Sequence, residues 1–200
     1  MQSLIGLLNF ACRVISPGRP FLRRLINSTM GIQKPHHHIS ISKPIRADIA
    51  AWLSFLSSFN GISLFPERDV LDSEHLKLYT DASGSVGFAG VWGAKWFAGA
   101  WPESWPTLHI TTKEMFPLTL LVEIWGERLA GKRILFHTDN AAVVHIINKQ
   151  SCADIHTMAL VRRLVVACIK FSIIFKATHI PGYTNVIADK LSRFSFQGAR

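Results

Sequence analysis

Four acidic residues lie at the end of, or within, predicted elements of secondary structure. They are Asp81 at the end of a strand, Glu114 in the first turn of a helix, Asp139 at the end of a later strand and Asp189 in a last helix. If the strands pair, the first and third of these carboxylates point to the same sheet edge, where sites form in open α/β sheets. Clustered carboxylates raise one another's pKa unless a cation neutralises them, and hard oxygen ligands select Mg²⁺ or Mn²⁺ over zinc. Two such ions roughly 4 Å apart can activate a water molecule and stabilise the leaving oxygen of a phosphodiester.

The elements that must position these acids follow from hydrophobic periodicity. The first strand lies in HLKLYTDAS, and a helix is predicted to start near Thr111, with Pro117 tolerated close to that start. The remaining strands are Val86–Trp92, Lys95–Trp101, Arg133–Thr138 and Phe171–His179, and the remaining helices are Asn140–Asn148, Ile155–Ile169 and Asn185–Arg193. The predicted fold is therefore α/β, with a five-stranded mixed sheet in the order βββαβααβα flanked by helices.

Residues 1–70 have a different pattern, which predicts a helical segment. Two short helices are expected on either side of a turn at 16–20, followed by a helix over Ile45–Phe59 and a linker over Pro66–Asp72. The apolar start is interrupted by Asn9 and Arg13 and has no basic residue before it, so it does not fit a secretion signal. The triplet at 36–38 consists of histidines, but adjacent residues on a regular element cannot all face one ion, so no zinc site is expected there.

The charge of the chain is uneven. Its 200 residues carry 22 Lys+Arg and 13 Asp+Glu, with a sequence pI near 9.9. Residues 1–70 and 131–200 are basic, whereas residues 71–130 hold 7 acidic and 4 basic side chains. A basic surface suits a polyanionic partner, while an acid-rich segment inside a basic chain suits metal binding. With 48% hydrophobic residues and no membrane-length apolar run, we expect an intracellular globular protein, in the cytoplasm or nucleus, that is neither secreted nor membrane-bound. Its three cysteines are expected to be thiols.

Four ordered segments carry a family resemblance: LYTDASGSVGFAGVW, TTKEMFPL, ILFHTDNAAVVHIIN and HIPGYTNVIADKLSR. Together they resemble the ribonuclease H domain of reverse-transcribing retroelements, with wording similar to that of DIRS-type retrotransposons. The resemblance covers residues 74–194 and leaves 195–200 as a tail. It implies a metal-dependent endonuclease that hydrolyses the RNA strand of an RNA–DNA hybrid with two Mg²⁺ (or Mn²⁺) ions. Asp81 and Asp139 would be the central ligands, Glu114 would hold the attacking-water side and Asp189 would complete the second metal. Taken alone, Glu114 and Asp189 also fit ordinary surface or helix-start charges.

Further residues are candidates for nucleic-acid contact. Ser83, Gly84 and Asn140 suit backbone and sugar contacts, but tight-turn and helix-cap chemistry explains them equally well. Arg162 and Arg163 suit phosphate contacts, or simply a solvated helix face. Trp92, Trp96 and Trp101 fit a buried sheet face better than a base-stacking platform.

The sequence departs from cellular ribonuclease H in one loop. Those enzymes carry a histidine before the last aspartate, whereas this chain has Tyr183 after Pro181-Gly182. His179 lies nearby in a strand and is expected to be structural. A nucleic-acid-binding remnant that kept the fold and lost turnover therefore stands as an alternative. An integrase-type nuclease would need a carboxylate triad, and the fourth acid in its Asn-x-x-Ala-Asp context favours ribonuclease H.

The segment 1–70 also has a family resemblance. It is similar to the thumb-like or connection region between polymerase and ribonuclease H in DIRS-type elements, which implies that the polymerase portion is a further partner. The paired-aspartate motif of a polymerase is absent from these 200 residues, so no DNA synthesis is expected.

Overall fold

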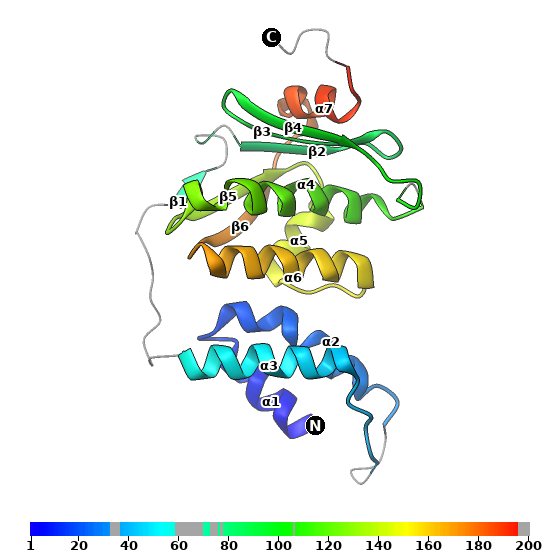
Figure 1. The fold of residues 1–200 in the computed structure, drawn as a ribbon, viewed down its shortest axis with the longest axis vertical. Helices are drawn as coiled ribbons and strands as arrows, with labels where there is room; N and C mark the ends of the chain where they lie inside the picture. Colours follow the sequence, from blue (N-terminus) through cyan, green and yellow to red (C-terminus); the bar gives the residue numbers. More distant parts are fainter. Residues whose placement is uncertain (33–36, 59–69, 73–75, 77, 106, 196–200) are drawn as a thin grey trace. The chain divides into compact units, whose positions relative to one another are not determined.

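The computed structural model describes residues 1–32, 37–58, 70–72, 76, 78–105 and 107–195 (Figure 1). The chain divides into two compact units, Met1–Phe65 and Pro66–Arg200. Among the described residues, no helix is both long and apolar enough to cross a membrane.

The described secondary structure of the first unit is helical. Its elements are α1 (Gln2–Ala11), the 3₁₀ helix η1 (Ser16–Phe21), α2 (Arg23–Ser28) and α3 (Lys43–Ser58). Trp52 of α3 is buried and packs on Gly18 of η1, where a Cβ atom would come within 2.2 Å of the indole ring. The buried Asp48 of α3 pairs with Arg24 of α2 at 3.0 Å. These contacts fix α3 on the two preceding elements. The predicted end of this helix at residue 59, the histidine at 36 and residues 66–69 of the predicted linker lie outside the described residues.

The second unit alternates strands and helices. Its strands are β1 (Val70–Asp72), β2 (Leu78–Ala82), β3 (Gly87–Trp92), β4 (Lys95–Ala100), β5 (Arg133–Thr138) and β6 (Ile174–His179). Its helices are α4 (Ile110–Trp125), η2 (Gly126–Leu129), α5 (Ala141–Lys149), α6 (Ile155–Lys170), η3 (Gly182–Thr184) and α7 (Val186–Ser192). From β2 onward the order of strands and α-helices is βββαβααβα, so the predicted element order of a mixed α/β fold is confirmed.

The backbone ladders differ in detail from a single five-stranded sheet. Strands β2, β3 and β4 form an antiparallel sheet, and β1, β5 and β6 form a parallel one. Strand β2 contacts β5, but no ladder joins them among the described residues. Strand β1 lies where the sequence predicts a linker and pairs in parallel with β5. Three residues are too few for alternation to reveal such a strand.

Helices cover both faces of the antiparallel sheet. Figure 1 shows α7 on one face of β2–β4 and α4 on the other, with α6 packed along α4. Ala188 and Leu191 of α7 pack against Ala89 and Val91 of β3 in a fully apolar cluster. This packing sets the distance of α7 from β2, which carries the first acid.

The aromatic residues of the sheet have separate roles. Trp101 is buried, and its indole N–H donates to the Ser83 carbonyl at 2.8 Å, while Trp92 packs on Trp125 with ring centroids 5.7 Å apart. The prediction of a buried face is wrong for Trp96, which is 56% exposed. Strand β4 lies at the edge of its sheet, so its alternation does not translate into burial.

Candidate metal centre

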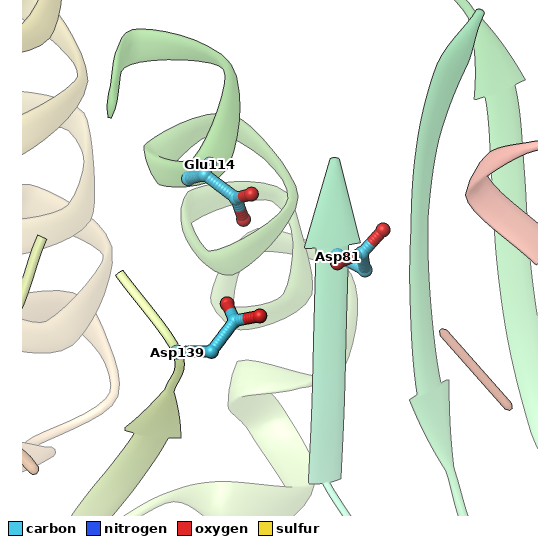
Figure 2. A group of neighbouring side chains, drawn as sticks. All are labelled: Asp81, Glu114 and Asp139. Atoms are coloured by element: carbon cyan, nitrogen blue, oxygen red, sulfur yellow. The ribbon is translucent and has the colours of Figure 1, made fainter. Parts of the chain in front are cut away.

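Three of the four acids converge on one point in the second unit. Asp81 lies in β2, Glu114 in α4 and Asp139 directly after β5, and one carboxylate oxygen from each lies within 4.8 Å of the others. Figure 2 shows the Glu114 and Asp139 side chains pointing into the space beside β2. Each residue comes from a different element, so the cluster depends on the packing of α4 and β5 against β2.

The surroundings of Asp81 are the most enclosed of the three. The residue is 7% exposed, and its Oδ2 accepts a hydrogen bond from Ser192 Oγ of α7 at 2.5 Å. Burial raises the pKa of Asp81, the Ser192 hydrogen bond opposes that rise, and the charges of Asp189 and Asp139 add to it. The carboxylate is therefore held in place by a donor on the opposite face of the sheet from α4.

Glu114 is the acid whose protonation is most strongly altered. Helix α4 begins at Ile110 and is capped by His109 Nδ1, which accepts from Thr111 N at 3.2 Å. Glu114 therefore lies just beyond the first turn of the helix, whereas the sequence predicted it within that turn. Burial, as the largest cause, and the charges of Asp81, Asp139 and Asp189 together raise the pKa of Glu114 from its usual 4.5 to about 9. Every cause acting on this carboxyl disfavours its charged form in the metal-free protein.

The backbone at Asp139 is tied to the segment that follows β6. His179 Nε2 donates to the Asp139 carbonyl oxygen at 3.0 Å. Gly182 lies close to the carboxylate, because a Cβ atom at that position would come within 2.9 Å of Asp139 Oδ2. The strand histidine therefore has a structural contact, as expected, and Tyr183 beside it is 80% exposed.

Asp189 lies outside the group of three. It sits in the first turn of α7, and its Oδ1 accepts from Arg193 Nε at 2.7 Å in an ion pair four residues apart. Its charge nevertheless raises the pKa of both Asp81 and Glu114. It is thus electrostatically coupled to the cluster while its carboxylate is paired elsewhere.

The structure gives the turn and cap candidates internal partners. Ser83 is buried, and its Oγ accepts from the backbone N–H groups of Val86 (2.9 Å) and Gly87 (2.7 Å) in the β2–β3 turn. Asn140 Oδ1 accepts from two backbone N–H groups at the start of α5, at 3.0 and 3.2 Å. The Gly84 carbonyl accepts from Lys113 Nζ at 2.5 Å, although the residue itself is exposed. The two side chains have the turn and cap contacts that the sequence allowed as alternatives.

The two candidate arginines lie on α6. Arg163 forms a two-pronged ion pair with Glu123 of α4, with N–O distances of 3.0 and 2.7 Å. Arg162 is largely buried. Together with Lys170 and Phe171, the two arginines line a cavity of about 420 Å³.

The donor set fits a hard divalent cation. Three carboxylates offer only oxygen atoms, which suits Mg²⁺ or Mn²⁺ better than zinc. Like charges this close cannot all ionise without a neutralising partner, and this repulsion adds to burial in raising the pKa of Glu114. A cation between the three carboxylates would remove it.

Sequence reasoning missed several supporting residues. Ser192, Asn185 and Lys113 contact the acids or the neighbouring backbone, but nothing in their types sets them apart. The one signal was position, since Asn185 and Ser192 flank Asp189 within the fourth resembling segment.

No protein-family model matches the sequence, and no curated protein matches it. Solved structures that match the chain include ribonuclease H1 from the halophilic archaeon Halobacterium salinarum NRC-1, with 16% identity and a TM-score of 0.44 over 60% of this chain and 94% of that one. They also include the protease-reverse transcriptase of prototype foamy virus, with 17% identity and a TM-score of 0.32 over 88% of this chain. A foamy viral protease-reverse transcriptase in complex with double-stranded DNA aligns with 15% identity and a TM-score of 0.34. The chain spans 24% of the former viral chain and 33% of the latter.

Proposed function

We propose that this protein is a divalent-metal-dependent endonuclease that hydrolyses the RNA strand of RNA–DNA hybrids. The observation that carries the proposal is the convergence of Asp81, Glu114 and Asp139 from three separate elements to within 4.8 Å. A carboxylate cluster can support several metal-dependent reactions. The sequence motifs around these acids resemble those of retroelement ribonuclease H, and this resemblance favours hydrolysis of RNA in a hybrid.

The chain's own residues would divide the work. Asp81 and Asp139 would hold the metal ions centrally, Glu114 would face the attacking water, and Asp189 would join by turning away from Arg193. Mg²⁺ or Mn²⁺, when bound as a pair, supplies charge neutralisation and an acidified water molecule. Glu114 would lose its proton as the site fills, because its pKa is raised by burial and by the neighbouring negative charges, and a cation favours the charged form against both.

The wider assignment is part of the same proposal. Residues 74–194 would form the ribonuclease H domain of a DIRS-type reverse transcriptase, and residues 1–70 its connection segment beside a polymerase portion. Selectivity would rest on helix shape and RNA 2′-hydroxyl groups, with little dependence on base sequence. Gly84 and the backbone beside Ser83 and Asn140 would contact the hybrid near the acids. The phosphate role of Arg162 and Arg163 stays a prediction from the sequence, because Arg163 is paired with Glu123 and Arg162 is largely buried.

Cleavage of a labelled RNA–DNA hybrid by the purified chain tests the proposal, with Mg²⁺, with Mn²⁺ and with a chelator. The matched control is Asp139→Asn, which removes one charge and keeps the size of the side chain. We expect metal-dependent cutting of the RNA strand by the parent and a loss of about 100-fold or more in the variant, since loss of a single outer-shell partner already costs roughly 10- to 100-fold.

A folded parent that binds the hybrid without cutting it would favour the nucleic-acid-binding remnant. The exposed Tyr183, where cellular enzymes carry a histidine, is the feature that favours that outcome. Equal cutting by the parent and Asp139→Asn would show that the acid cluster is not the site.

A further inference from the structure

Helix α7 is attached to β2 at both of its ends, once at Thr80 and once at Asp81. At its start, Asn185 Nδ2 donates to the Thr80 carbonyl oxygen at 2.8 Å. At its end, Ser192 Oγ donates to Asp81 Oδ2 at 2.5 Å. Both α7 residues are buried, with exposures of 4% and 0%. The segment from Asn185 to Ser192 is therefore fixed to the strand at the central acid and at the residue before it.

The hydroxyl of Ser192 faces two acceptors but has one hydrogen. Besides Asp81 Oδ2, the Asp189 carbonyl oxygen lies 2.9 Å from Ser192 Oγ. A hydrogen bond from a hydroxyl to a carboxylate is short, about 2.5–2.7 Å, and is stronger than one between neutral groups. The shorter contact to Asp81 is therefore the one that receives the hydrogen while that carboxylate is charged.

The first attachment point also has an unusual feature. Asn185 Oδ1 is buried and has no hydrogen-bond partner among the described residues. An orphaned acceptor in a protein interior is unfavourable and calls for an explanation. The other end of the same amide group explains its position, because Asn185 Nδ2 donates to the Thr80 carbonyl oxygen. This hydrogen bond holds the start of α7 on the backbone next to Asp81 and keeps the amide oxygen buried.

We infer that Ser192 is a positioning residue for Asp81, whose hydroxyl fixes the rotation of the carboxylate so that its second oxygen is presented to a divalent cation shared with Glu114 and Asp139. The consequence for cleavage rests on the proposed function, but the effect on metal binding does not. A partner of this kind orients a metal ligand and typically changes metal affinity by roughly 10- to 100-fold.

The test is Mn²⁺ binding to the full chain, measured by calorimetry, in the parent, Ser192→Ala and Ser192→Cys. The matched control is Thr119→Val, because Thr119 is also fully buried and its hydroxyl donates to the Met115 carbonyl instead of a carboxylate. We expect Ser192→Ala to weaken Mn²⁺ binding about tenfold. Ser192→Cys keeps a weak S–H donor at nearly the same size, so it should fall between the parent and alanine. Thr119→Val should bind as the parent does.

The outcomes separate this inference from the proposed function. Equal Mn²⁺ affinity in the parent and Ser192→Ala overturns the positioning role. Equal Mn²⁺ affinity in the parent and Asp81→Asn also overturns it, because the bound ion would then not depend on Asp81. Failure of both Ser192 variants to fold, seen by circular dichroism, would make the residue a structural anchor and also overturn it. Weakened binding in Ser192→Ala together with no hybrid cleavage by the parent would overturn the proposed function alone.

Discussion

Helix α4 carries two glutamates whose surroundings are opposite in character. Glu114 and Glu123 are nine residues apart, which at 3.6 residues per turn places them on opposite sides of the helix. Glu114 faces two aspartates at the sheet edge, whereas Glu123 faces the guanidinium of Arg163 on α6. The same side chain on the same helix is therefore placed once among like charges and once against an opposite charge.

This difference separates a structural charge from a functional one. The Glu123–Arg163 pair is complete within the protein and joins two helices that already pack together. The Glu114 cluster is unfavourable as it stands, since burial and like charges raise the pKa of Glu114 to about 9. Such a cluster is stable against its own repulsion only when protons or cations are bound. The perturbed acid therefore lies on the side of the helix that the proposed function uses.

The largest contrast should come from changing each glutamate to its neutral isostere. We expect Glu114→Gln to reduce hybrid cleavage by about 100-fold or more, because it removes a ligand charge from the cluster and outer-shell partners alone are worth roughly 10- to 100-fold. Glu123→Gln should leave the rate within about twofold, because a surface ion pair contributes little. The measurement is the single-turnover rate of both variants at saturating Mg²⁺. Comparable losses of rate in the two variants would contradict the division of α4 into a side that serves cleavage and a side that serves structure.

Much of the fold could be predicted because the relevant patterns are local. Alternation around Leu78 and Ile134 marks β2 and β5, and the punctuation at Gly131 and Pro181 separates the elements that follow. These patterns also predict that Asp81 and Asp139 lie at strand ends. The predicted position of Glu114 within its helix differs from the observed one by less than a turn. The reason is that His109 caps α4, so the helix begins at Ile110 and not at Thr111.

The remaining features depend on contacts that local patterns do not encode. Ser192 and Asp81 are 111 residues apart in the chain, and only the packing of α7 on β3 brings them together. Strand β1 is too short to show a period, and its partner β5 lies about sixty residues further on. The pairing of Arg163 with Glu123 likewise depends on the register between α4 and α6, which hydrophobic periodicity leaves open.

A smaller effect should appear in thermal stability as a function of pH. In the metal-free protein, the pKa of Glu114 is raised from 4.5 to about 9, so the folded state binds its proton more tightly than the unfolded state. The resulting stabilisation is fully present below pH 4.5 and is lost as the pH rises toward 9. Glu114→Gln does not titrate, so the melting temperature of the parent relative to this variant should fall across that interval, by about 2–4 °C for each kcal/mol lost.

Magnesium should reverse this trend, because it binds only the deprotonated carboxylates. The increase in melting temperature on adding Mg²⁺ should therefore be larger at pH 8 than at pH 5 for the parent, and small at both values for Glu114→Gln. Differential scanning fluorimetry with and without a chelator measures all four values. An equal shift at both pH values would mean that the cation binds away from the acid cluster.

The smallest effect should come from the other side of α4. The side chain of Arg163 is 47% exposed and that of Glu123 is 30% exposed, so solvent screens their attraction. Arg163→Lys keeps the charge and loses the two-pronged geometry, which should lower the free energy of unfolding by about 0.5 kcal/mol and by less at high salt. Urea unfolding at two salt concentrations measures the change. A loss of several kcal/mol that salt does not alter would mean that the pair is buried in solution. The two glutamates would then differ only in the charge of their partners and not in their exposure to solvent.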